Sequence, residues 1–190
     1  MSPIAIPRFA LLSGLVAVLA AAPFRTARPQ AALDAKSAAH VRDAYLADLD
    51  TVHVKIMALA NAIPADKYSW RPGPGVRSIA QVLTHVAGEW YFYAPSSVAV
   101  RPPADFTRAS MAKLDSVTNK PDVLRELEKS WAHCKTAIAG VDPSKLTAPY
   151  EPWKVNLDQA AFLMSGDLHE HLGQLIAYAR SVGVKPPWSK

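Results

Sequence analysis

Apolar residues recur at steps of three and four over four stretches of the chain, and proline-rich connections separate these stretches. This spacing places the apolar side chains on one face of a helix. The first predicted helix covers residues 33–62 and ends before Pro64. Its expected buried stripe consists of Val41, Tyr45, Leu49, Val52, Ile56, Leu59 and Ile63.

Three further helices are predicted, over residues 78–93, 121–139 and 156–183. Ser78 is followed three residues later by Gln81, the pattern of a capping box, and therefore marks the start of the second helix. Proline is well tolerated in a first helical turn, so Pro121 suits the start of the third. The fourth has an apolar seam at Leu157, Ala161, Met164, Leu168, His171, Leu175 and Tyr178.

The connections at residues 94–118 and 146–155 contain several prolines and are expected to be irregular, with a short helical turn at 108–114. No alternating pattern indicates a strand. The sequence therefore predicts an all-α fold, an up-down four-helix bundle with long irregular connections. The interior of such a bundle is a usual place for a metal site.

Half of the 190 residues are hydrophobic, as expected for a packed domain, which we place at residues 33–190. Residues 1–32 differ in character: Arg8 precedes an apolar run at 9–19 and small residues at 20–22. This is the pattern of a cleavable secretory signal peptide followed by a short linker. The run is short for a membrane span, so we expect a periplasmic or secreted protein without a stable membrane anchor.

The formal net charge of +5 decreases to +2 without residues 1–32, and the remainder has no basic run. Nucleic acid is therefore not an expected partner. Cys134 is the only cysteine, so no intrachain disulfide can form, and its helical neighbours favour a buried, inert thiol.

Candidate chemistry is concentrated in the fourth helix. Asp167 and His171 are four residues apart and share a face, whereas His169 points about 200° away from each of them. His85 lies in the middle of the second helix's apolar face. Burial of ionisable groups is costly unless they are paired or bind an ion. The residues alone leave two readings open, a metal site or hydrogen-bonded core histidines.

The segments Leu83-Thr84-His85-Val86 and His171-Leu172-Gly173-Gln174 resemble the DinB-like superfamily of four-helix bundles. The resemblance covers residues 33–188 and includes the segments 66–72 and 177–183. It implies a divalent metal, with zinc or nickel expected first and iron or manganese as alternatives. It also implies His85 and His171 as ligands, with Asp167 as the third, at a position where the family usually has histidine. Aspartate is shorter than glutamate, so Asp167 could reach the ion through water.

Two further residues are candidates for this site. His53 lies at the edge of the first helix's stripe, where it is either a hydrogen-bonded boundary histidine or a fourth ligand or proton carrier. Glu89 follows His85 by one turn and is expected to orient its imidazole.

The resemblance implies a metal-dependent hydrolase or thiol transferase that acts on an unknown small molecule. No catalytic residue is assigned, and no serine or cysteine nucleophile with an adjacent base is visible. The alternative is a non-catalytic bundle that binds a metal or ligand, or that forms a homodimer through an exposed helical face.

Overall fold

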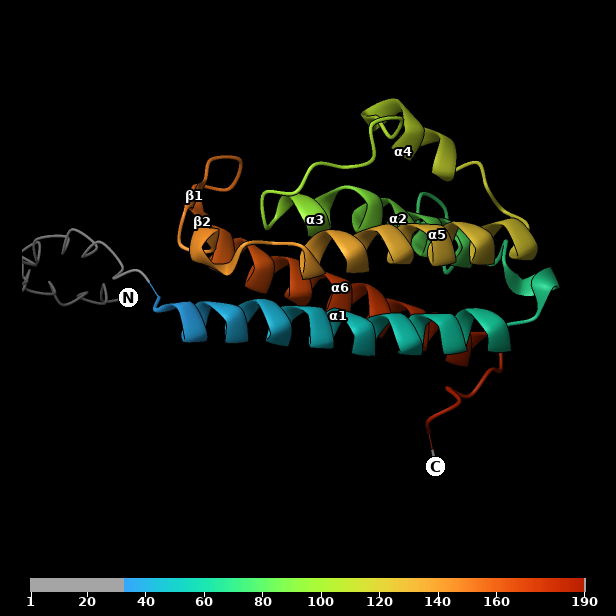
Figure 1. Cartoon of the computed structure of the whole chain (residues 1–190). Coiled ribbons are helices and arrows are strands. Elements are labelled where there is room, and N and C mark those ends of the chain that lie inside the picture. The colour runs from blue at the N-terminus through green and yellow to red at the C-terminus, as the bar shows by residue number, and fades with distance from the viewer. Residues whose placement is uncertain (1–32, 190) are drawn as a thin grey trace, which may run out of the picture. The chain divides into compact units, whose positions relative to one another are not determined.

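The computed structural model describes residues 33–189, apart from the side chain of Arg108. Its four long helices are α1 (Ala35–Ala62), α2 (Ile79–Tyr91), α5 (Lys120–Ala139) and α6 (Leu157–Ser181). Helices α5 and α6 each pack against both α1 and α2, so the four form a bundle (Figure 1). The predicted all-α bundle is therefore confirmed, whereas the signal peptide predicted for residues 1–32 lies outside the described residues and stays a prediction.

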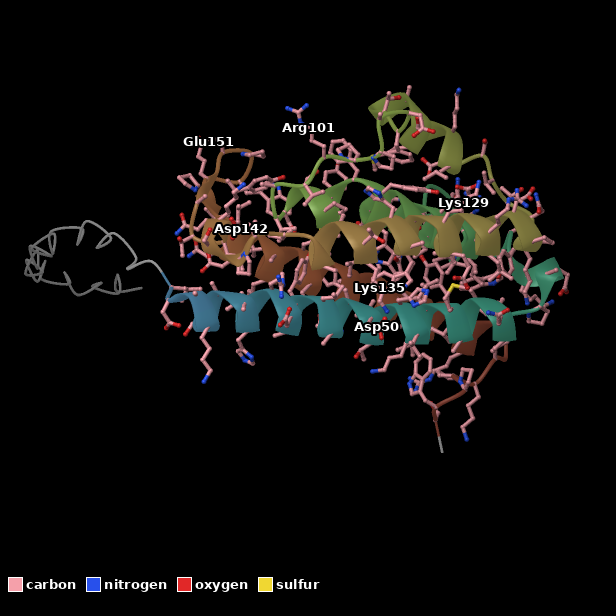
Figure 2. The ribbon with its side chains drawn as sticks, in the orientation of Figure 1. Asp50, Arg101, Lys129, Lys135, Asp142 and Glu151 are labelled. Carbon is pink, nitrogen blue, oxygen red and sulfur yellow. The ribbon has the colours of Figure 1, made fainter. Side chains whose placement is uncertain are left out.

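The four helices run up, down, down and up, so that α1 is parallel to α6 and α2 is parallel to α5 (Figure 1). The ammonium group of Lys120, at the start of α5, donates hydrogen bonds to the carbonyls of Asn61 and Ile63 at the end of α1. Further along α5, Lys135 forms an ion pair with Asp50 of α1 (Figure 2). The direction differs from strict up-down alternation because the connection at residues 92–119 returns along the bundle before α5 begins.

The connections contain short elements. They are two 3-10 turns (Ala65–Lys67 and Pro143–Lys145), two short helices, α3 (Tyr93–Ser96) and α4 (Arg108–Leu114), and two antiparallel strands, β1 (Pro149–Tyr150) and β2 (Val155–Asn156). The helical turn expected at 108–114 is present as α4. The strands contain only two residues each, which is too short for an alternating pattern to be visible in the sequence.

The ends of the helices follow from local sequence. The Ser78 hydroxyl accepts a hydrogen bond from the Gln81 backbone, and the Gln81 side chain accepts one from the Ser78 backbone. The predicted capping box is thus formed. At α5 the Asn119 side chain accepts a hydrogen bond from the backbone of Asp122, with Pro121 in the first turn. These bonds satisfy backbone donors that have no partner within the helix.

Side chains from all four helices form one hydrophobic core, which includes the predicted α6 seam except Leu157 and His171. On α1 the whole predicted stripe is buried except Val41, which is half-buried. Burial of each large aliphatic side chain contributes roughly 1.5–3 kcal/mol relative to exposure. None of the described helices has a stretch long and apolar enough to cross a lipid bilayer.

Gly88 allows α4 to lie closely against α2. A Cβ atom at this position would meet the Met111 side chain at 3.2 Å and the Leu114 side chain at 3.6 Å. By contrast, apart from the adjacent residues and the helix's own backbone, no atom of residues 33–189 lies within 4 Å of a Cβ atom added to Gly166 on α6. Substitutions at Gly88 and Gly166 therefore separate the effect of close packing from that of the low helix propensity of glycine.

We expect Gly88→Val to lower the free energy of unfolding by about 1–3 kcal/mol, because the added methyl groups displace α4. Gly166→Ala, the control, should raise the free energy of unfolding by up to about 1 kcal/mol through helix propensity. Urea denaturation followed by circular dichroism measures both. An unchanged midpoint for Gly88→Val would show that α4 does not pack here.

Candidate metal centre

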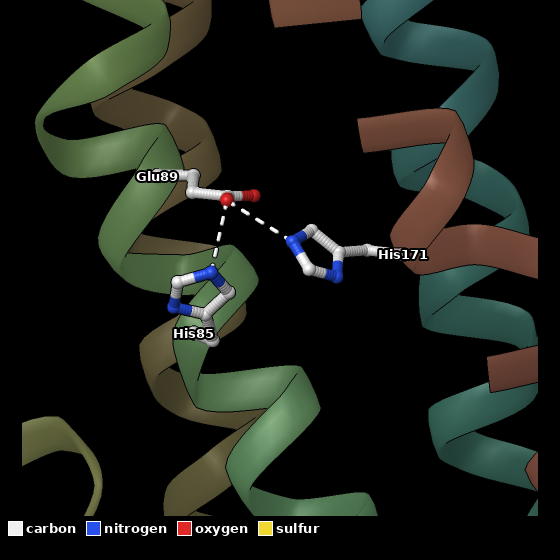
Figure 3. A group of neighbouring side chains, drawn as sticks. All are labelled: His85, Glu89 and His171. Atoms are coloured by element: carbon white, nitrogen blue, oxygen red, sulfur yellow. Dashed lines mark ion pairs between the residues drawn. The ribbon is translucent and has the colours of Figure 1, made fainter. Parts of the chain in front are cut away.

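Three side chains from two helices converge at one point within the bundle. The Nε2 atom of His85 lies 3.1 Å from Glu89 Oε1, and the Nε2 atom of His171 lies 3.2 Å from the same oxygen. The two imidazole rings are 4.8 Å apart between centroids and nearly perpendicular. Figure 3 shows both rings directed at the Glu89 carboxylate, His85 from the same helix and His171 from the facing one.

This arrangement follows from the positions of the three residues along helices α2 and α6. His85 and Glu89 are one turn apart on α2, so their side chains point in the same direction. Helix α6 runs antiparallel to α2 (Figure 1) and places His171 beside this pair (Figure 3). The Glu89 side chain is only 4% exposed, while those of His85 and His171 are 22% and 16% exposed. The carboxylate therefore lies inside the bundle and the imidazoles lie nearer its surface.

Burial and hydrogen bonding act in opposite directions on Glu89. Burial alone raises its pKa, but the hydrogen bonds from His171 and His85 outweigh burial and lower the pKa to about 2. The same hydrogen bond to Glu89 raises the pKa of His171 against the opposing effect of burial. The carboxylate is thus ionised, and it attracts positive charge to the space between the two rings.

The residues present fit a divalent metal ion. Glu89 Oε2 is buried and has no hydrogen-bond partner among the described residues, so its lone pairs remain free to accept a hydrogen bond or bind a cation. The ligand atoms of His85, Glu89 and His171 all lie within 4.8 Å of one another. Ligand atoms about 2.0 Å from a tetrahedral ion are about 3.3 Å apart, close to the two nitrogen–oxygen separations found here. Two imidazoles and one carboxylate suit zinc, nickel or iron.

Gln174 holds the His171 ring in a suitable orientation. Its Oε1 atom lies 3.3 Å from His171 Nδ1, and its Nε2 atom donates to the Tyr178 hydroxyl at 3.1 Å. The amide oxygen can only accept, so Nδ1 carries a proton, and Nε2 is the nitrogen that either donates a hydrogen bond to Glu89 or, once deprotonated, binds a metal. An outer hydrogen bond of this kind fixes the tautomer that a metal ligand requires. Sequence reasoning assigned Gln174 no such role, although its i+3 spacing from His171 was a usable signal.

Asp167 lies beside the three converging side chains rather than among them. Its Oδ2 atom is 3.9 Å from His171 Nε2, and its side chain is 49% exposed. Burial and the neighbouring Glu89 carboxylate raise the pKa of Asp167 to about 6. Glu89, expected to orient His85, instead contacts both imidazoles and offers an oxygen of its own. Asp167 as the third ligand stays a prediction.

The structure places His53 and His169 away from this cluster. His53 stacks on Trp131 with 4.6 Å between ring centroids and meets the edge of Trp90 at 5.4 Å. Its ligand atoms are not among those that converge with Glu89, so a role as fourth ligand has no support in this arrangement. His169 pairs with Asp48 of α1 at 2.9 Å and faces away from the cluster, as its spacing indicated.

Two of the three converging side chains, His85 and Glu89, line a cavity of about 420 Å³. His85, Glu89 and Asp167 form its polar part, and the larger part of its lining is apolar: Tyr93, Trp153, Leu163 and Met164. We call this space the metal-site cavity. It is large enough for a small organic molecule to reach the polar groups.

The family model of the DinB superfamily matches residues 48–175, which is more than half of the chain and includes all three converging residues. The protein therefore belongs to the DinB superfamily. Comparison with curated proteins gave no match.

The competing ligands Glu89 and Asp167 can be separated by matched amide substitutions. We expect Glu89→Gln to weaken zinc affinity by more than about 100-fold, because the buried anionic oxygen is lost. Asp167→Asn should weaken it by less than about tenfold, since this carboxylate is half-exposed and lies 3.9 Å from His171 Nε2. Competition titration with a zinc chelator measures both affinities. The reverse order would identify Asp167 as the third ligand.

The aromatic surroundings of His53 predict a pH dependence of stability. Burial lowers its pKa and the nearby Lys135 acts in the same direction, whereas Glu128 and Asp50 oppose them. Below the ordinary histidine pKa of about 6.5, the unfolded chain takes up a proton that the folded chain resists, so stability falls with decreasing pH. We expect the free energy of unfolding to fall less between pH 7.5 and 5.5 in His53→Phe than in the wild type.

Urea denaturation at the two pH values measures this difference. His40→Gln changes an exposed histidine of the same helix and should retain the wild-type dependence. Parallel pH dependences for the wild type and His53→Phe would contradict the prediction.

Proposed function

We propose that this protein is a metal-dependent hydrolase or thiol transferase that acts on a small organic molecule. His85, Glu89 and His171 hold a divalent cation, with zinc or nickel as the leading candidates. The observation that carries the proposal is the convergence of three ligand atoms beside a cavity, with a buried carboxylate oxygen that lacks a hydrogen-bond partner among the described residues. Because the protein supplies three ligands, an ion bound there would retain a position for substrate or water.

A bound divalent ion supplies Lewis-acid chemistry, since it polarises an oxygen or sulfur of the substrate and favours deprotonation of the nucleophile. Asp167 is the proposed proton acceptor. Its carboxylate lines the cavity, is half-exposed, and lies beside His171. From that position it can accept a proton from a water or thiol that enters the cavity.

The apolar lining of the cavity favours a substrate with an apolar part. Leu163 and Met164, on α6, precede Asp167 by one turn and form the wall next to the polar groups. Trp153, from the turn between β1 and β2, lines the cavity as well. Such a lining excludes water from one side of a bound molecule, which strengthens the electrostatic interactions at the other side.

Metal analysis of the purified protein tests the proposal. We expect close to one zinc or nickel ion per chain by elemental mass spectrometry, and a loss of most of this metal in His85→Ala and His171→Ala. His169→Ala is the matched control, because this histidine is on the same helix but pairs with Asp48. Negligible metal in the wild type, unchanged in these variants, would overturn the proposal.

Turnover distinguishes an enzyme from a bundle that only binds metal. A panel of esters, amides and thiol adducts should yield a substrate whose conversion needs the metal. For that substrate, Asp167→Asn should lower kcat by about 100-fold with little loss of metal, as expected when a general base is removed. Stoichiometric metal without turnover of any of these compounds would favour the non-catalytic alternative.

A further inference from the structure

A second cavity adjoins the metal-site cavity. It has a volume of about 610 Å³ and lies between the segment after α2 and the turn that joins β1 and β2. Tyr93 and Trp153 line both spaces and therefore form a shared wall. We call this second space the outer cavity.

Aromatic rings form much of the outer cavity. Phe92 and Tyr93 meet edge to face with 5.1 Å between centroids, and Tyr150 and Trp153 do so with 5.3 Å. The two pairs come from the two sides of the cavity, one from the end of α2 and the start of α3, the other from the hairpin. Aromatic walls of this kind offer a large apolar contact area to a planar or apolar group.

Arg101 gives the outer cavity its charge. It lines the cavity, is exposed, and forms no ion pair or hydrogen bond with any other described residue. No aspartate or glutamate belongs to the described lining. Figure 2 shows Arg101 and Glu151 projecting from the same side of the bundle, but Glu151 does not line the cavity. A guanidinium group in this setting suits a carboxylate, which it can bind through two parallel hydrogen bonds.

The backbone on both sides of the outer cavity is strained. In the described part of the chain, Ala99 and Lys154 are the non-glycine residues with positive φ, at 62° and 54°. Each adopts the left-handed conformation, which costs roughly 1–2 kcal/mol for a residue with a side chain. Ala99 lies in the segment that carries Arg101, and Lys154 directly follows Trp153. Such strain persists where the surrounding structure requires a particular loop conformation.

We propose that the two cavities bind one elongated substrate that carries a terminal carboxylate. Its reacting group lies in the metal-site cavity, its apolar or aromatic middle lies against Tyr93 and Trp153, and its carboxylate pairs with Arg101 in the outer cavity. This assignment rests on the proposed function, because the metal site defines the reacting end. The assignment extends the proposed function by naming a class of substrate: an apolar carboxylic acid whose opposite end carries a metal-binding group.

Hydroxamates of graded length test the proposal. Each compound carries a metal-binding hydroxamate at one end, a phenyl or alkyl spacer, and either a carboxylate or its methyl ester at the other end. Binding to the zinc-loaded protein is measured by calorimetry. At one spacer length we expect the carboxylate to bind about fivefold more tightly than the ester, the scale of an ion pair of about 1 kcal/mol.

Variants of the outer cavity identify the groups responsible. Arg101→Gln should abolish the preference for the carboxylate, whereas Lys129→Gln, an exposed α5 position with the same charge change, should leave it intact. Trp153→Ala should weaken acid and ester alike by about tenfold, because the shared aromatic wall is lost. Equal affinities of acid and ester at every length, or a preference that survives in Arg101→Gln, would overturn the proposal.

Metal content measured on the same samples distinguishes failure of the substrate assignment from failure of the proposed metal-dependent function. Zinc uptake and metal-dependent hydroxamate binding without a preference for the carboxylate would refute only the substrate assignment. A protein that takes up no zinc would refute the proposed function, and the substrate assignment with it.

Discussion

The buried carboxylate of Glu89 is the constraint on which the candidate centre depends. It lies on α2 near Val86 and Trp90, whose side chains are inaccessible to solvent. A carboxylate in such surroundings is unfavourable unless positive charge or hydrogen bonds compensate for lost hydration. His85 and His171 supply that compensation at one oxygen only. The second oxygen remains without a partner among the described residues, which is why a cation is the ligand that this site fits best.

Helix direction determines which residues can reach Glu89. Helices α2 and α6 are antiparallel neighbours. A residue one turn later on α2 therefore lies opposite a residue one turn earlier on α6. His85 is therefore close to His171, and Glu89 lines the same cavity as Asp167, whose pKa it raises. The long connection between α2 and α5 produces this topology, and its residues also form one side of the outer cavity. The same segment thus serves the fold and the proposed substrate site.

Much of the fold could be predicted from the sequence because helix periodicity and caps are local properties. The stripe on α1, the capping box at Ser78 and the short helix α4 all follow from residues close together in the chain. Chain direction could not be predicted, since it depends on how residues 92–119 pack over the bundle. The β1–β2 pair and its turn, which carries Trp153, left no periodic signal, and the outer cavity was therefore invisible in the sequence.

The candidate site was predictable only in part, for a related reason. Spacing identified the inward face of each helix, and this was enough to select His85 and His171. It could not decide between Glu89 and Asp167, because both lie one turn from a histidine on the relevant face. The choice depends on side-chain length and depth: glutamate on the buried helix reaches between the two rings, whereas the shorter aspartate remains at the cavity wall.

The hydrogen bond from Gln174 adds a further step, because it determines how the centre exchanges a proton for a metal ion. With Nδ1 of His171 committed to the Gln174 oxygen, only Nε2 can change its partner. A proton on Nε2 offsets the negative charge of Glu89. A divalent cation at the same place would offset it with a larger charge, and the lone pairs of both rings would bind the cation. Proton and metal therefore compete for one position between two helices, and a bound ion would link α2 to α6 where the polar groups interrupt the apolar core.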